Sequence, residues 1–276
     1  MTGRLILVGT PIGNLGDLSP RAVEVMSSAD VIACEDTRRT GRLLQLAGIP
    51  KRPLVTVNEH TEFDQRDPLL DRVGAGETVV LVSDAGMPVI SDPGERLVAA
   101  AADRGLIVEV VPGPTALSSA LALSGLPSAR FCFEGFLPRK GRERSERLAV
   151  VAGELRTTVL YEAPHRLVRT LEDLASQCGP DRRVVLAREL TKMHEELFRG
   201  SLADAVLWGA DHEIGEFVIV LAGAEPAAGA TDEQLLDALR AELAGGASGR
   251  DAVDAVSADL GVARRRVYQL MLSLSE

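Results

Sequence analysis

Aromatic residues and cysteines are scarce in this sequence, and each scarcity narrows what the protein can be. Aromatic residues make up 3% of the 276 residues, so the cores must be built from leucine, valine, isoleucine and alanine. The three cysteines, Cys34, Cys132 and Cys178, lie far apart and show no C-x-x-C spacing. This argues against a disulfide framework and fits a reducing compartment. The four histidines also lack the spacing of metal ligands, so we expect no metal site.

The sequence also has fewer basic than acidic residues, and it lacks long apolar runs. The chain has 40 acidic and 30 basic residues and a formal net charge of −10, which argues against a large basic surface but leaves local basic patches open. No apolar run approaches the length of a membrane span, and Met1–Arg4 leads into a strand-like run rather than a signal peptide. We therefore expect a cytoplasmic protein with no membrane partner. The length predicts about two domains.

The first part of the chain alternates between apolar runs and helical patterns. Strand-like runs occupy 5–8, 31–34, 54–57, 78–82 and 107–111. Apolar strands that alternate with helices predict a mostly parallel sheet covered on both faces. A further helix over 114–124 ends near Gly125-Leu126-Pro127. There we place the end of a first α/β domain, residues 1–126.

A second α/β domain is predicted over residues 127–224, and a helical tail over 231–276. The second domain has strand-like runs at 131–134, 157–161, 184–187 and 217–222, and helices near 142–153, 165–177 and 201–208. The segment 224–230, rich in alanine, glycine and proline, is interpreted as a hinge.

The tail begins with a capping-box pattern, Thr231-Asp232-Glu233-Gln234. Its last two helices have a helix-turn-helix outline, with Arg264-Arg265-Arg266 at the start of the final one. This outline is compatible with contact to nucleic acid, or with a small bundle that packs or dimerises. The formal net charge of the tail, −3, supports the second interpretation.

Residues Val82–Gly94 form the most informative stretch of the sequence. They follow an apolar run and contain two glycines, two prolines and two aspartates. Open α/β sheets bind ligands at the carboxyl ends of their strands, and glycine lets the backbone approach a ligand closely. The stretch is therefore interpreted as a binding loop. Asp92 is the expected N-cap of the next helix, and Pro93 its first residue.

Two more loops rich in glycine and proline follow predicted strands, Gly9–Gly16 and Val111–Ala116. The first lacks both G-x-G-x-x-G and the lysine of a P-loop, and Pro11 removes an amide that could hold a phosphate, so it predicts a ligand without phosphates. The second begins a helix whose free amides can hold a carboxylate. A simple strand-to-helix turn is the alternative for each loop alone. Three such loops at one edge of a parallel sheet favour a binding site.

Charged motifs follow other predicted strands. Cys34–Thr40 is interpreted as a polar cluster facing substrate, or else as an N-cap with solvated charges. Tyr161–Arg166 and Ala187–Lys192 each place a carboxylate beside cations, which suits a general base or equally a salt bridge. Pro138–Arg144 is rich in cations and holds one acid. It either clamps a phosphate backbone or is a solubilising surface loop.

Six motifs occur in an order that resembles one known family. They are Val8–Leu15, Glu35–Arg38, Ser83–Gly86 with Pro88, Pro112–Pro114, Phe133–Phe136 and Ala187–Lys192. Together they resemble the ribosomal RNA small subunit methyltransferase I family, of the tetrapyrrole methylase fold, over residues 4–222. The resemblance implies two α/β domains with S-adenosylmethionine in the cleft between them, and a homodimer. It also implies 2′-O-methylation of a cytidine in the decoding region of 16S rRNA.

The resemblance further implies which residues line the cofactor site. These are Pro11, Gly13, Asp84, Ala85, Gly86, Met87, Thr115 and Ala116 in the first domain, and Ala163, Ala187, Arg188 and Glu189 in the second. Met87 stands where the family motif often has threonine, which puts a side-chain hydroxyl contact there in doubt.

The chemistry requires a base for the ribose 2′-hydroxyl and alignment of the attacking oxygen with the methyl group. The candidate carboxylates are Glu35, Asp36 and Glu189, of which we hypothesise that Glu35 or Asp36 is the base. Arg38 and Lys192 would hold phosphates or orient the ribose.

Two other functions are compatible with the same sequence. One is a methyltransferase that acts on carbon atoms of a tetrapyrrole, and the other is an RNA-binding assembly factor without catalysis. The segment 139–147 and the arginine-rich tail favour RNA over a tetrapyrrole. Because the protein is acidic and has few aromatic residues to stack on bases, we expect weak binding of free RNA. A partly or fully assembled small ribosomal subunit is then the better substrate.

Overall fold

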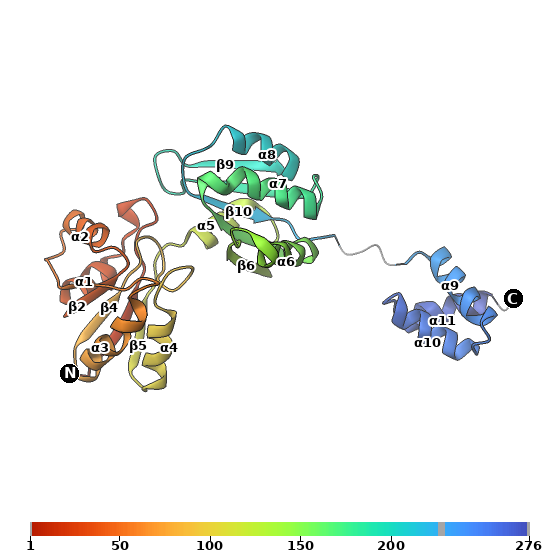
Figure 1. Cartoon of the computed structure of the whole chain (residues 1–276), viewed down its shortest axis with the longest axis horizontal. Coiled ribbons are helices and arrows are strands. Elements are labelled where there is room, and N and C mark those ends of the chain that lie inside the picture. Colours follow the sequence, from red (N-terminus) through yellow and green to blue (C-terminus); the bar gives the residue numbers. More distant parts are fainter. Residues whose placement is uncertain (1, 226–229, 275–276) are drawn as a thin grey trace. The chain divides into compact units, whose positions relative to one another are not determined.

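The computed structural model describes residues 2–225 and 230–274 of the chain. It divides into two compact units, Met1–Gly223, which holds both β-sheets, and Ala224–Glu276 (Figure 1). The predicted α/β class, with two sheets and a helical C-terminal segment, is confirmed. Across the described ranges, no helix has both the length and the apolar character needed to cross a membrane. The predicted hinge at 224–230 lies partly outside the described residues.

The first sheet is parallel throughout, as predicted, with strand order β3-β2-β4-β1-β5. Its strands are β1 (Arg4–Val8), β2 (Val31–Cys34), β3 (Leu54–Thr56), β4 (Thr78–Leu81) and β5 (Ile107–Val111). The helices between them are α1 (Pro20–Ser28), α2 (Thr37–Leu46), α3 (Glu62–Gly74) and α4 (Glu95–Asp103), with a short 3₁₀ turn η1 (Leu15–Asp17) after β1. All five strands therefore end at one edge of the sheet.

Both faces of the first sheet are covered, because successive strand residues point to opposite sides. Ile6 belongs to the core that includes Met26 of α1 and Leu44 of α2. Its neighbour Leu5 belongs to the core that includes Leu69 of α3 and Leu97 of α4. Two helix layers thus hold the sheet rigidly, and its carboxyl edge carries the loops.

The predicted start of α4 at Asp92 and Pro93 is wrong. The helix begins at Glu95, and its N-cap residue is Gly94, with φ of 120° and no side chain to cap the first amides. The side chain of Glu62, in the first turn of α3, does this instead. Its Oε1 accepts hydrogen bonds from the amides of Arg96 at 2.9 Å and Leu97 at 3.2 Å. Asp92 therefore stays in the loop.

The second sheet is mixed, with strand order β6-β7-β10-β8-β9. Only β6 and β7 run parallel among its described pairs. The strands are β6 (Phe131–Phe136), β7 (Thr157–Glu162), β8 (Arg183–Arg188), β9 (Glu196–Ser201) and β10 (Phe217–Leu221). One face is covered by α6 (Gly141–Gly153), α7 (Leu167–Cys178) and α8 (Leu202–Ala210), and η2 (Pro164–Arg166) precedes α7.

Two elements of this region differ from the sequence analysis. β9 was not predicted, because its Glu-Leu-Phe-Arg-Gly-Ser sequence is half polar and lies at the edge of the sheet. Helix α5 (Ala116–Ser124), assigned above to the first domain, packs on the second sheet. Its Ala120 and Leu121 join the core formed by Val218 and Val220 of β10. Thr115 is the N-cap of α5 and accepts a hydrogen bond from the amide of Ser118.

The C-terminal unit contains α9 (Asp232–Ala244), α10 (Gly249–Asp259) and α11 (Arg264–Ser273). The predicted capping box is confirmed, with reciprocal hydrogen bonds between Thr231 and Gln234. Two of the three arginines at the start of α11 form ion pairs inside the unit, Arg264 with Asp254 and Arg266 with Asp232. These two arginines therefore each link α11 to another helix of the unit by an exposed ion pair.

Candidate functional site

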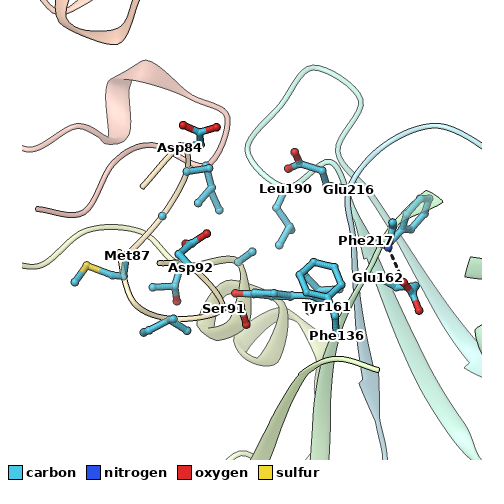
Figure 2. Close-up of a pocket in the computed structure, with 18 of the residues that line it drawn as sticks. Asp84, Met87, Ser91, Asp92, Phe136, Tyr161, Glu162, Leu190, Glu216 and Phe217 are labelled. Carbon is cyan, nitrogen blue, oxygen red and sulfur yellow. Dashed lines mark hydrogen bonds between the residues drawn. The ribbon is translucent and has the colours of Figure 1, made fainter. Parts of the chain in front are cut away.

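A cavity of about 370 Å³ lies within the first unit, between the carboxyl-edge loops of the first sheet and the strands of the second. Figure 2 shows Asp84, Asp92 and Met87 on the loop side, opposite Leu190, Glu216 and Tyr161. The volume is in the range of small-molecule and cofactor sites. The residues lining it are Ile12, Glu35, Arg39, Asp84, Ala85, Gly86, Met87, Ile90, Ser91, Asp92, Thr115, Ala116, Phe136, Tyr161, Glu162, Ala163, Pro164, Ala187, Leu190, Glu216, Phe217 and Val218.

The loop after β4 is held to the loop after β1 by backbone hydrogen bonds. Thr10 and Gly86 pair in an antiparallel bridge, with N···O distances of 2.8 and 3.1 Å. The buried Thr10 hydroxyl also donates to the carbonyl of Ser83 at 3.2 Å. Gly86 has φ of 82°, which a residue with a side chain rarely adopts. The bridge fixes the backbone of Asp84–Met87 against the cavity.

Two glycines bring the loops after β1 and β5 into direct contact. A Cβ built on Gly9 would lie 2.6 Å from both the Cα and the nitrogen of Gly113, and a Cβ on Gly113 would lie 2.8 Å from the Cα of Gly9. Met87 packs on this contact, since its sulfur would lie 2.8 Å from a Cβ on Gly9. Figure 2 shows the Met87 side chain pointing away from the second sheet. Met87 thus lines the cavity beside the glycine contact.

Beyond Met87 the loop adopts a strained backbone. Val89 has φ of 77° and Ser91 has φ of 61°, and a β-branched residue in this region is a genuine outlier. Such residues cost on the order of 1–3 kcal/mol each and persist where surrounding structure fixes them. Strand β6 approaches this segment closely, because a Cβ on Gly135 would lie 3.2 Å from the Ser91 hydroxyl. Ser91 and Asp92 belong to this strained segment and line the cavity.

Three carboxylates from two loops meet at the loop side of the cavity: Glu35 after β2, and Asp84 and Asp92 after β4. Burial, followed by the charge of Asp84, raises the pKa of Glu35. Burial, followed by the charges of Glu35 and Asp84, raises the pKa of Asp92 to about 7. Asp84 pairs with Arg39, at 3.2 Å between Oδ2 and Nη1, and its Oδ1 accepts from the amide of Asp36. The group therefore favours a cation or a bound proton.

Asp36 and Arg38, both predicted as catalytic, do not line the cavity. Asp36 is the N-cap of α2, and its Oδ1 accepts from the amide of Arg38 at 2.8 Å. Its Oδ2 pairs with the guanidinium of Arg38 at 2.8 Å. Hydrogen bonds from the side chain and backbone of Arg38 hold the pKa of Asp36 well below its usual range. This environment suits a helix cap better than a proton acceptor.

The second sheet provides an apolar wall. The Tyr161 hydroxyl accepts from the amide of Leu117 at 3.1 Å, which ties β7 to the first turn of α5. Phe136 packs edge-on against Tyr161, with ring centroids 5.7 Å apart. A bulge between Phe133 and Gly135 interrupts the β6–β7 register just before Phe136, and bulges commonly re-aim side chains beside active sites. Ala187 of β8 and Phe217 and Val218 of β10 complete this wall.

An ion cluster borders the cavity at the end of β8. Lys192 Nζ lies 2.8 Å from Glu189 Oε1 and 3.0 Å from Glu216 Oε2, and Glu216 lines the cavity. Although burial opposes the shift, the hydrogen bond from Lys192 lowers the pKa of Glu189. Glu189 and Thr191 have φ of 50° and 65°, so this turn is strained like the loop after β4.

The structure brings together most, but not all, of the site residues predicted from the sequence. Those lining the cavity are Glu35, Asp84, Ala85, Gly86, Met87, Thr115, Ala116, Ala163 and Ala187. Those that do not line it are Pro11, Gly13, Asp36, Arg38, Arg188, Glu189 and Lys192. Gly13 instead allows close packing, because a Cβ there would meet the side chains of Lys192 and Thr191. Arg188 donates hydrogen bonds to the carboxylate of Glu196 and to the carbonyl of Ile214.

Sequence reasoning missed several lining residues. The sequence suggested Asp92 only as a helix cap. Tyr161 and Glu162 were predicted only as members of a charged motif. Phe217 and Val218 carry no signal, because they are ordinary apolar residues of a buried strand. Ile12 lies between Pro11 and Gly13, and Arg39 follows Arg38. The motifs therefore identified the correct loops, but the side chains that line the cavity are those of the neighbouring residues. Among the described residues, no group of three or more histidine, cysteine and acidic side chains could hold a metal ion.

The fold matches a known class of enzymes. The sequence profile of the Tetrapyrrole (Corrin/Porphyrin) Methylases matches residues 4–206. The methyltransferase CobJ has a TM-score of 0.61 and 22% identity, covering 81% of this chain and 95% of that chain. A Thermus thermophilus uroporphyrin-III C-methyltransferase, complexed with S-adenyl homocysteine, has a TM-score of 0.57 and 23% identity, covering 79% and 97%. The chain therefore belongs to the Tetrapyrrole (Corrin/Porphyrin) Methylases family and shares the fold of these enzymes.

Closer relatives narrow the family. Proteins named Ribosomal RNA small subunit methyltransferase I are 46% identical in Synechocystis, over 99% of this chain and 98% of that protein, and 48% identical in Mycobacterium tuberculosis, over 82% and 79%. The protein of that name in Escherichia coli O157:H7 is 44% identical, over 86% and 83%. This chain belongs to the ribosomal RNA small subunit methyltransferase I family.

Proposed function

We propose that this protein transfers a methyl group from S-adenosylmethionine to the ribose 2′-oxygen of a cytidine in 16S rRNA. One observation carries the proposal. A chain of this family has an acidic cavity between its two sheets, and three carboxylates from two loops line one side of it. The site in the decoding region follows from the resemblance of the motifs.

The cavity fits S-adenosylmethionine chemically. This cofactor has a sulfonium and an ammonium cation, an adenosine and a carboxylate, but no phosphate. Among the described lining residues, Arg39 is the single arginine or lysine, and Asp84 neutralises it. Glu35, Asp84 and Asp92 would hold the cationic groups. The fixed backbone of Asp84–Met87 and the walls at Ala163 and Ala187 would hold the rest.

The bound cofactor supplies an electrophilic methyl group on sulfur. The protein must orient the 2′-hydroxyl and accept its proton. Glu35 is the proposed acceptor, because it lines the cavity and its raised pKa makes it a better base than an ordinary carboxylate. Asp36 remains the weaker candidate as a base. Arg38, whose side chain is 91% exposed, would bind a phosphate of the RNA, and Lys192 with Glu189 would fix Glu216 at the rim.

The proposed physiological substrate is the small ribosomal subunit, and the proposed state of the enzyme is a homodimer in the cytoplasm. An exposed apolar strand supports the dimer. β5 is an edge strand of the first sheet, and Ile107, Val108 and Val110 are each exposed on it. Exposed apolar edges of this kind are usually covered by another chain. Light scattering would test the dimer, and a monomer at micromolar concentration would contradict it.

Methyl transfer from tritiated S-adenosylmethionine to small subunits from cells that lack this protein tests the function directly. Nuclease digestion should then release labelled 2′-O-methylcytidine. Label on another nucleoside would correct the acceptor. Cofactor binding without any labelled RNA would contradict the proposal and favour a tetrapyrrole acceptor. Loss of both would leave a non-catalytic assembly factor. Protein-free rRNA serves as the comparison substrate, and equal turnover on it would argue against the assembled subunit.

A further inference from the structure

The segment Arg139–Arg147 holds five cations, and the structure separates them into two groups. Arg142 pairs with Glu146 at 2.6 Å, and Arg147 pairs with Glu134 at 3.0 Å. Arg144 is buried against Asp173 at 2.7 Å. The side chains of Arg139 and Lys140 are exposed and make neither a hydrogen bond nor an ion pair with any residue that the structure describes. Two adjacent cations are thus left for another partner.

The two residues just before these cations are fixed from behind by two guanidinium groups. Arg166 Nη2 donates to the carbonyl of Leu137 at 2.6 Å, and Arg144 Nη1 donates to the carbonyl of Pro138 at 2.9 Å. Loops in general are mobile and satisfy their carbonyls with water. A turn with two consecutive carbonyls held by arginines is instead fixed in place, and it fixes where Arg139 and Lys140 emerge.

Both guanidiniums are organised by one buried carboxylate, Glu162. Its Oε1 lies 3.1 Å from Arg166 Nε, and its Oε2 accepts from the Thr170 hydroxyl at 2.6 Å. The same hydroxyl accepts from Arg144 Nη2 at 3.0 Å. The Glu162 side chain is 1% exposed. We call Glu162, Thr170, Arg144 and Arg166 the clamp. Removing one partner of such a buried network is costly, because the others lose their hydrogen bonds.

The clamp lies directly behind the cavity wall. Glu162 is a lining residue, and Figure 2 shows its carboxylate pointing away from the space between the two walls. Phe136 lines the cavity and precedes the clamped turn by one residue. Three residues of extended chain span at most about 11 Å, so the Cα of Arg139 lies within that distance of the Cα of Phe136. The backbone that carries the free cations is therefore close to the edge of the cavity at Phe136.

We propose that Arg139 and Lys140 bind phosphodiester groups of the RNA strand that flanks the acceptor ribose, and that the clamp is a positioning device for them. This rests on the proposed function. Phosphates are the RNA groups that arginine and lysine bind irrespective of base sequence. Because the backbone just before them is held in place, these cations lose less conformational freedom on binding than cations on a mobile loop would. The clamp thus sets how the RNA strand enters the site, while the carboxylates across the cavity act on the cofactor and the hydroxyl.

The first test compares two double variants of the full chain, Arg139→Gln/Lys140→Gln and Arg142→Gln/Arg147→Gln. Each removes two positive charges from the same segment. We expect the first to raise the KM for small subunits about tenfold or more, and to reduce the slope of log KM against log salt by about 1.5. Its kcat and its affinity for S-adenosylhomocysteine should stay within about twofold. The second should change each quantity by less than about twofold. Equal effects of the two variants would overturn the proposal.

The second test concerns the clamp and uses Thr170→Val and Thr170→Ser. We expect valine to raise the KM for subunits severalfold, and serine, which keeps the hydroxyl, to restore it. In the Arg139→Gln/Lys140→Gln background, valine should raise KM no further, because the residues that it positions are gone. A merely structural threonine would weaken activity equally in both backgrounds, and that result would contradict positioning. Thermal melting identifies any variant that has lost its fold.

Direct binding of small subunits, measured by filter retention without turnover, separates this proposal from the proposed function. If the wild-type protein binds subunits through Arg139 and Lys140 but transfers no methyl group, the proposed function fails and the phosphate contact stands. If it methylates rRNA and both double variants behave alike, the phosphate contact fails alone. If it neither binds nor methylates subunits, both fail.

Discussion

The two walls of the cavity are built in opposite ways. The first wall consists of loops at the edge of a parallel sheet, with charged side chains, paired glycines and left-handed backbone at Val89 and Ser91. The second consists mainly of strand residues, such as Tyr161, Ala187 and Val218, whose backbones are fixed by a mixed sheet. Among the described residues, the unpaired charges that converge on the cavity thus come from the first wall, whereas the carboxylates of the second wall, Glu162 and Glu216, are held in ion pairs. Strain is tolerated where charges must converge, and regular strands suffice where an apolar surface is needed.

The largest expected effect is on the first wall, at Glu35. Glu35→Gln keeps the shape of the side chain and removes its basicity, so the single-turnover methylation rate should fall by about a hundredfold or more. Glu59→Gln is a matched control, since Glu59 is exposed and acts on Glu35 by charge alone. Asp36→Asn keeps a good N-cap and should retain the rate within about threefold. An unchanged rate in Glu35→Gln would remove Glu35 from the mechanism.

At the second wall, affinity for the cofactor should depend on side-chain volume rather than on charge. Ala187→Val adds two methyl groups to a buried residue that lines the cavity, so affinity for S-adenosylmethionine should fall about tenfold. Ala205→Val adds the same volume on the opposite face of the second sheet, in the core beneath α8. It should reduce the melting temperature without changing affinity. Calorimetry measures both quantities, and a loss of affinity in Ala205→Val would refute the division between the walls.

The raised pKa of Asp92, about 7, makes cofactor binding depend on pH. A cationic ligand favours the carboxylate, so affinity for S-adenosylmethionine should rise by about threefold to tenfold from pH 6 to pH 8. S-adenosylhomocysteine lacks the sulfonium charge and should respond less. The stability of the ligand-free protein depends on pH with the opposite sign. Asp92 keeps its proton up to about pH 7 in the folded state but loses it near pH 4 in the unfolded state. Stability therefore declines as the pH rises from about 4 to about 7.

Asp92→Asn should abolish the pH dependence of binding, measured by equilibrium dialysis. Asp103→Asn, at the exposed end of α4, should leave it intact. If the Asp92→Asn protein keeps the wild-type profile, another carboxylate, such as Glu35, is the titrating group.

The smallest expected effect is at the strained turn that borders the second wall. Thr191 has φ of 65°, and its hydroxyl is buried without a hydrogen-bond partner among the described residues. Thr191→Gly should therefore raise the free energy of unfolding by up to about 1 kcal/mol, since relief of strain outweighs the added flexibility of the unfolded chain. Denaturant titration measures this. A protein destabilised by the change would show that the turn is not strained.

The sequence predicted the first sheet well and the second less well, for a physical reason. Parallel strands buried on both faces, such as Val31–Cys34, appear as continuous apolar runs. The edge strand β9 carries Glu196, Arg199 and Ser201, and its pairing depends on the long-range partner β8. Helix α5 was recognised as a helix, but its mainly apolar sequence does not indicate which sheet it covers.

The cavity itself was predicted in part. The motif Ser83–Gly86 identified the correct loop, because glycine and proline after a strand have a local meaning that a sequence reveals. For Asp36 the sequence left two roles open, a helix cap and a catalytic base, because both use the same residue type in the same place, and the structure shows the cap. The lining by Phe217 and Val218 was not predictable either, since it arises only when β10 pairs between β7 and β8. A sequence shows the chemistry of a short motif, but it does not show which distant segments come together in the fold.

The contact between Gly9 and Gly113 has a consequence for how this protein can change over evolutionary time. Most pairs of touching residues can exchange size, with one side chain growing as the other shrinks. Here the nearest obstacles to a Cβ on either residue include main-chain atoms of the other glycine, and no mutation removes a main chain. Neither position can therefore be rescued by a change at the other. The two sites should remain invariant together, even in lineages where the carboxylates of the cavity and the cations at Arg139 and Lys140 have been replaced.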